Sequence, residues 1–98
     1  MNKKIIYIAS DHAGFKLKTH ILKAFPEIVD LGTKSKNSVD YPDFAHKLTQ
    51  KVLLHKDNSG ILICGTGVGM SIAANRKKGI RAGLVNNTIT ARLIRKHN

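Results

Sequence analysis

Residues 60–75, GILICGTGVGMSIAAN, have the pattern of a buried strand, a glycine-rich turn and the start of a helix. Gly65, Gly67 and Gly69 alternate through the turn, so the backbone can adopt left-handed conformations and a ligand can approach its peptide groups. The first N–H groups of the helix point into this turn. The stretch therefore predicts a site for an anion, either a phosphate or an oxyanion.

Cys64, the only cysteine in the chain, lies at the mouth of this turn. A thiol beside a helix N-terminus can act as a base or nucleophile. A lone cysteine is also often a small core residue, and on these residues alone both interpretations stay open. The glycine spacing is G-x-G-x-G, which differs from the Walker A and dinucleotide-binding patterns, so a nucleotide is not the expected ligand.

Length and charge set the class of protein. The 98 residues, 42% of them hydrophobic, predict one domain over residues 1–98. Seventeen basic and six acidic residues give a net charge of +11, which favours a phosphorylated metabolite, a nucleic acid or an acidic surface as partner. The single cysteine suits a reducing compartment, and we expect a cytoplasmic protein without a signal peptide or membrane helix.

Strand and helix patterns alternate four times along the chain. Strands are expected at residues 4–9, 28–31, 61–63 and 80–85. Helices are expected from the SDHAG segment at residues 10–14 to Pro26, from a start at residues 40–43 with a buried stripe that reaches Val52, from the glycine turn to about Asn75, and at residues 88–96. Apolar residues at helical spacing predict the buried faces of three helices: Leu17, Ile21 and Phe25; Phe44, Leu48 and Val52; Ile89 and Leu93. The alternation predicts an α/β fold, a three-layer Rossmann-like α/β/α parallel sheet with strand order 2-1-3-4.

Ligands of such sheets bind at the carboxyl ends of the strands. Asp11 and His12 follow the first strand, and Cys64 follows the third. If these two strands are neighbours, both groups line one crevice, which is the central structural expectation. Without that context, Asp11 and His12 could instead cap the helix that they precede.

Five segments along the chain resemble ribose-5-phosphate isomerase type B. They are SDHAG at residues 10–14, VDYPD at 39–43, ICGTGVGMS at 63–71, GIRA at 79–82, and TAR at 90–92 with HN at 97–98. The resemblance covers the whole chain in the right order. The related galactose-6-phosphate isomerase subunits share the same framework.

The resemblance implies an enzyme that interconverts ribose 5-phosphate and ribulose 5-phosphate through an enediolate, with no metal or organic cofactor. Cys64 would move the proton between C2 and C1, and Thr66 would move a proton between the two oxygens. His97 would open the sugar ring with the help of Asp11. The substrate-binding residues implied are Asp11, His12, Tyr41, Gly65, Thr66, Gly67, Val68, Gly69, Ser71 and Asn98.

Members of the family continue beyond this His-Asn pair, and the extension supplies a fifth strand, the C-terminal helices of a homodimer and arginines that bind the phosphate. The 98 residues contain no counterpart, so a C-terminally truncated domain is expected. Two alternatives to an active isomerase remain. One is an inactive remnant or partner subunit of a split isomerase. The other is a basic nucleic-acid-binding module, against which stand the few aromatic residues and the absence of a recognised motif.

Overall fold

Three parallel strands form the centre of the molecule. The computed structural model describes residues 4–98. The sheet has the order β2-β1-β3, built from β1 (Ile6–Ser10), β2 (Val29–Asp30) and β3 (Ser59–Ile63). In the β1–β3 ladder Ser10 lies opposite Ile63, so both strands end at the same edge of the sheet. The expectation that the first and third strands are neighbours is therefore confirmed.

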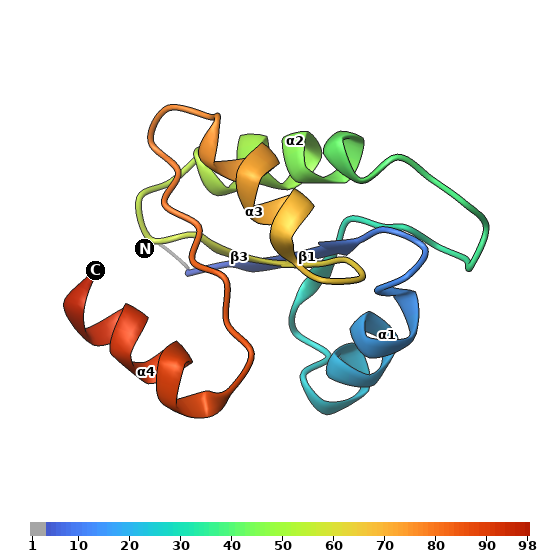
Figure 1. Cartoon of the computed structure of the whole chain (residues 1–98), viewed down its shortest axis with the longest axis horizontal. Helices are drawn as coiled ribbons and strands as arrows, with labels where there is room; N and C mark the ends of the chain where they lie inside the picture. The colour runs from blue at the N-terminus through green and yellow to red at the C-terminus, as the bar shows by residue number, and fades with distance from the viewer. Residues whose placement is uncertain (1–3) are drawn as a thin grey trace.

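Four helices accompany the sheet: α1 (Phe15–Ala24), α2 (Tyr41–Val52), α3 (Val68–Asn75) and α4 (Thr88–His97). Figure 1 shows α1 on one face of the sheet and α2 with α3 on the other. This is the layered α/β arrangement expected from the alternating pattern. In the described part of the chain, no helix has the length and apolar character needed to cross a bilayer.

The core lies between β1 and α2. Tyr7 and Ala9 of β1 pack against Leu48 of α2, with Phe44 and Val52 partly buried around them. The apolar stripe predicted for the second helix is thus confirmed. A second cluster of Ala45, Met70 and Ala73 joins α2 to α3, and this fixes the helix that follows the glycine turn.

The buried face of α1 differs from the expectation. Leu17 and Phe25, predicted to face the sheet, are each 53% exposed, whereas Lys18 is 1% exposed. The sheet-facing position falls on Lys18 because its ammonium group reaches the carboxylate of Asp30, and its stem supplies the apolar contact that a leucine would give. The apolar spacing therefore predicted the helix correctly and its buried face wrongly.

The apolar face predicted for α4 is also wrong. Ile89 and Leu93 are 70% and 51% exposed, and α4 contains no buried residue. No element within residues 4–98 covers these side chains, so the amphipathic pattern has no partner surface in this structure.

The fourth strand expected at residues 80–85 does not form. Within the described residues no backbone hydrogen bond joins this segment to β3, and the sheet ends at β3. The side-chain amide of Asn75 accepts from the N–H of Ala82 at 2.7 Å and donates to its carbonyl at 2.9 Å. These contacts occupy the groups that strand pairing at Ala82 would need, so the strand order 2-1-3-4 is absent here.

Candidate active site

The ends of β1 and β3 bring two of the predicted groups together. The N–H of Asp11 donates to the carbonyl of Ile63 at 3.2 Å, and Asp11 is buried. Gly14 packs so closely on β3 that a Cβ placed there would lie 2.7 Å from the Ile63 carbonyl oxygen. The turn from Asp11 to Gly14 therefore lies against the residue that precedes Cys64.

Asp11 shapes the turn in which it lies. One oxygen of its carboxylate accepts a hydrogen bond from the N–H of Gly14 at 3.0 Å, just before α1 begins. The N-cap of α1 is Gly14 and no side chain forms a cap hydrogen bond there, so this bond braces the turn before the helix and does not cap the helix. It holds a buried carboxylate in one orientation beside β3.

His12 is exposed and connects this turn to the loop before α2. Its Nδ1 accepts a hydrogen bond from the N–H of Val39 at 3.2 Å. In the neutral ring this contact places the proton on Nε2, which leaves that N–H free to donate to a ligand. The sequence did not predict the contact with Val39, because the donor is a backbone N–H and does not depend on the type of side chain.

The glycine turn holds the sulfur of Cys64. The N–H of Gly67 donates to Sγ at 3.1 Å, and Gly67 has a φ of +82°, which favours glycine. This contact fixes the position of the sulfur over the turn. The hydroxyl of Thr66 accepts from the N–H of Val68 at 3.1 Å, beside the same turn.

The first turn of α3 provides further donors. The N–H groups of Gly69 and Met70 donate to no acceptor within residues 4–98. They lie at the positive end of the helix, where a developing negative charge is stabilised. The Ser71 hydroxyl, in contrast, donates to the Val68 carbonyl at 2.8 Å and is already engaged within α3.

Tyr41 forms a wall of this region. Its ring packs on Gly69, where a Cβ would lie 2.8 to 3.1 Å from three ring and hydroxyl atoms. Tyr41 is 40% exposed, so its ring lies at the border between α3 and solvent.

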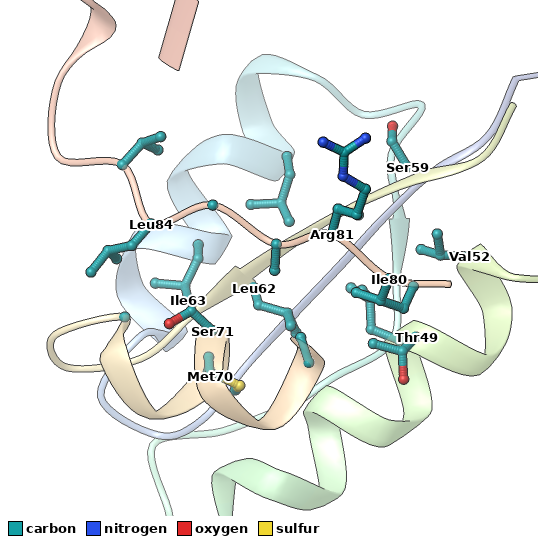
Figure 2. A pocket seen from close by; sticks show the side chains of 18 of the residues that line it. Thr49, Val52, Ser59, Leu62, Ile63, Met70, Ser71, Ile80, Arg81 and Leu84 are labelled. Carbon is teal, nitrogen blue, oxygen red and sulfur yellow. The ribbon is translucent and has the colours of Figure 1, made fainter. Parts of the chain in front are cut away.

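A pocket of about 720 Å³ runs from the glycine turn along β3. Residues 64–67 and Ser71 line one end, and residues 79–86 form the side opposite β3. Figure 2 shows Leu62 and Ile63 of the strand facing the segment that carries Ile80 and Leu84. Thr66 and Ser71 contribute hydroxyls at the turn end, whereas Asp11, His12 and Tyr41 do not line this pocket.

The structure does not bring His97 and Asn98 to this site. Both are exposed at the end of α4. Figure 1 shows that end of α4 near the N-terminal side of the sheet, whereas the turn after β3 lies at the opposite side. Asp11, His12, Tyr41 and the glycine turn come together, and the two C-terminal residues do not.

Asp30, at the end of β2, lies among groups that change the pKa of its carboxyl. Burial raises the pKa of Asp30, but hydrogen bonds from Lys18 and Gly32 and the charges of Lys18 and Lys34 outweigh burial. The pKa is therefore lowered from its ordinary value of 3.8.

Residues 4–98 contain no group of three or more His, Cys, Asp or Glu side chains placed to hold a metal ion.

Fold and site together define a class of protein. It is a parallel α/β domain in which a thiol lies over a glycine turn, and an acid and an imidazole follow the neighbouring strand. Residues 6–98 match the model of the family described as Ribose/Galactose Isomerase. The chain belongs to this family.

Named relatives agree with this assignment. The chain is 44% identical to ribose-5-phosphate isomerase B of Escherichia coli over 100 residues, covering 98% of this chain and 66% of that protein. The structure of ribose-5-phosphate isomerase B from Clostridium thermocellum has a TM-score of 0.89 at 46% identity, covering 94% of this chain and 65% of that one. The Thermotoga maritima ribose 5-phosphate isomerase has a TM-score of 0.88 at 51% identity, covering 99% and 70%.

Proposed function

We propose that this chain carries the proton-transfer centre of an aldose–ketose isomerase that interconverts ribose 5-phosphate and ribulose 5-phosphate. One observation carries the proposal: the Asp11–His12 turn and the Cys64 turn lie at one edge of the sheet, joined through the Asp11 N–H and the Ile63 carbonyl. The name of the Escherichia coli relative supports the choice of substrate. In this proposal residues 1–98 act as one domain, in the cytoplasm.

The proposed reaction begins when the Cys64 thiolate removes the proton from C2 of the open-chain aldose. The C2–H electron pair forms the C1–C2 double bond of an enediolate, and the carbonyl electrons move to O1. Thr66 transfers a proton between O2 and O1. Cys64 then returns its proton to C1, leaving the carbonyl at C2. The electrons are redistributed within the sugar, so the balance requires no external oxidant or reductant.

Stabilisation of the enediolate is assigned to backbone N–H groups of the glycine turn, among which that of Gly69 donates to no acceptor within residues 4–98. The proposed substrate-binding set is the one given by the resemblance: Asp11, His12, Tyr41, Gly65, Thr66, Gly67, Val68, Gly69, Ser71 and Asn98. Ser71 would have to release the Val68 carbonyl before its hydroxyl could donate to substrate.

Ring opening by His97, assisted by Asp11, requires His97 to reach the glycine turn. We assign this role to a second copy of the chain in a homodimer, since α4 ends at the far side of its own sheet. Dimerisation would also cover the exposed Ile89 and Leu93. In the same assembly residues 80–85 would close the gap to β3 and complete the strand order 2-1-3-4.

A second candidate is a partner subunit of a split isomerase. One observation favours it: the edge of β3, which no strand within residues 4–98 pairs. An open strand edge is a surface for pairing with another chain. In this case the proton-transfer residues are in place and activity depends on a complementary polypeptide.

A coupled isomerase assay on the purified chain tests the leading proposal. We expect formation of ribulose 5-phosphate by the wild type and loss of at least about a hundredfold in kcat for Cys64→Ala, because the base is removed. His20→Ala, a surface change on α1, is the matched control and should retain wild-type activity.

Equal rates in the wild type and Cys64→Ala would refute the role of Cys64. An inactive wild type that gains activity when a polypeptide with the remaining third of a relative is added would support the partner-subunit candidate instead.

A further inference from the structure

An ion pair between a buried lysine of α1 and a half-buried aspartate of β2 lies outside the site described above. Lys18 is 1% exposed, and its ammonium donates to both carboxylate oxygens of Asp30 at 2.9 and 3.0 Å. The same ammonium lies 5.2 Å from the centre of the Phe15 ring. A lysine is rarely buried in this way unless it is paired, and pairing of both oxygens fixes the position of the partner.

The carboxylate of Asp30 passes this constraint to the chain that follows β2. Its Oδ1 also accepts a hydrogen bond from the N–H of Gly32 at 2.9 Å. The carbonyl of Gly32 then accepts from the N–H of Ser10 at 2.8 Å, and the N–H of Thr33 donates to the carbonyl of Ser10 at 3.0 Å. Lys18 is thus linked to Ser10 through Asp30 and Gly32.

Ser10 immediately precedes Asp11, and the hydrogen bonds with Gly32 and Thr33 hold the Ser10 backbone on the β2 side of β1. The β1–β2 register ends with Ile8 opposite Asp30, two residues before Ser10. The bonds from Gly32 and Thr33 continue the pairing to the end of β1, where Ser10 and Thr33 are both buried. On the other side, the Asp11 N–H is held by Ile63 of β3. The end of β1 is therefore clamped between two segments.

An apolar pair of similar size could fill the space under α1, but it could not accept the hydrogen bond from Gly32. Replacement of a buried ion pair by apolar residues often preserves stability, whereas removal of one partner does not. This difference separates the space-filling role of the pair from its effect on the segment beside Ser10.

We propose that Lys18 and Asp30 are positioning residues that hold the Gly32–Thr33 segment against Ser10 and thereby fix Asp11 at the edge of the glycine turn. The consequence for catalysis rests on the proposed isomerase function; the consequence for the geometry of Ser10 and Asp11 does not. Lys18 belongs to α1 and Asp30 to β2, and neither lines the pocket at the glycine turn, so neither is assigned a contact with substrate.

Three variants of the full chain test the proposal: Lys18→Met, Asp30→Asn, and the double change Lys18→Met with Asp30→Leu. Lys34→Met is the matched control, since Lys34 lies 3.4 Å from Asp30 but is 75% exposed. The measurements are thermal unfolding, amide hydrogen exchange of Ser10, Thr33 and Gly14 by NMR, and kcat and KM for ribose 5-phosphate. Gly14 reports on Asp11, whose carboxylate accepts its N–H.

We expect the double variant to recover most of the thermal stability lost in either single variant. In the same double variant, exchange at Ser10, Thr33 and Gly14 should remain faster than in the wild type by roughly tenfold or more, because the acceptor for Gly32 is missing. Its kcat should stay lower by about a hundredfold with a smaller change in KM. Lys34→Met should match the wild type in all three measurements.

A double variant with restored stability and wild-type exchange at these three amides would overturn the proposal and leave the pair as a space-filling element. If the wild type shows no isomerase activity, the proposed function fails, and the exchange measurements still decide whether the pair positions Ser10 and Asp11. If the double variant does not fold, exchange in the single variant Asp30→Leu, which also lacks an acceptor for the Gly32 N–H, gives the same decision at a temperature where that variant is folded: wild-type rates there would refute the proposal.

Discussion

Cys64 and Asp11 are held by the same local device. Each accepts a hydrogen bond from the backbone N–H three residues further along, Gly67 for the sulfur and Gly14 for the carboxylate. Both donors are glycines at the entrance to a helix, so the side chain is fixed by a turn rather than by a neighbouring side chain. The residue types in the two motifs indicated the site, but these bonds depend on backbone geometry that spacing does not specify.

The acid dependence of stability is the first prediction at this scale. The folded-state pKa of Asp30 lies below its ordinary value of 3.8, so the stabilisation from Asp30 is complete above that pH and is lost as the pH falls through the lowered folded value. Asp30→Asn removes this contribution. Chemical unfolding measured from neutral to acidic pH should show a steeper loss in the wild type than in the variant below that pH. Parallel curves would contradict the assignment.

Gly14 gives a prediction of steric origin. A Cβ there would lie 2.7 Å from both the Ile63 carbonyl oxygen and a side-chain atom of Ile63, and the backbone of β3 cannot move aside easily. Gly14→Ala should therefore lower the free energy of unfolding by about 1–3 kcal/mol. Gly65→Ala is the control for stability, because its Cβ would lie 3.8 Å from Ala13. Similar unfolding curves for the two variants would show that Gly14 does not pack tightly on β3.

At the scale of elements, the sequence patterns predicted all four helices found in residues 4–98, whereas hydrophobic spacing, applied to three of them, gave one buried face correctly. α2 follows its stripe because Leu48 lies over β1. α1 does not, because an ion pair formed with a residue distant in sequence, Asp30, places Lys18 against the sheet. The fourth strand was predicted but does not form. Residues 80–85 have a strand-like composition, but Asn75 binds the polar groups of Ala82.

Isolation of α4 leads to a prediction about helix capping. The Asn87 side chain accepts from the Thr90 N–H at 2.8 Å, and the helix buries no residue that would compensate for its loss. Asn87→Ala should destabilise α4 locally by about 0.5–2 kcal/mol. We expect faster amide exchange at residues 91–97 with an unchanged global unfolding midpoint.

Thr90→Ala is the matched control for that variant, because only the backbone N–H of Thr90 takes part in the cap. A lowered global midpoint in Asn87→Ala would show that α4 is coupled to the rest of the fold.

For the whole molecule, two features leave surface for a partner. Within residues 4–98 no strand pairs with the outer edge of β3 and α4 buries no residue, and the net charge of +11 favours an anionic ligand. The sequence predicted the layered parallel fold because alternating strands and helices allow few arrangements. It could not place His97, because the position of a helix that buries no residue is not determined by its own pattern.

Proton abstraction from C2 of ribose 5-phosphate is the most direct test of the central claim that Cys64 and Asp11 form one isomerase site. The purified chain is incubated with ribose 5-phosphate in deuterium oxide and followed by NMR. We expect the C2 proton signal to decrease in the wild type, with ribulose 5-phosphate formed, and to persist in Cys64→Ala. A C2 proton that persists with the wild type at high protein concentration, or that disappears equally fast with Cys64→Ala, would contradict the claim.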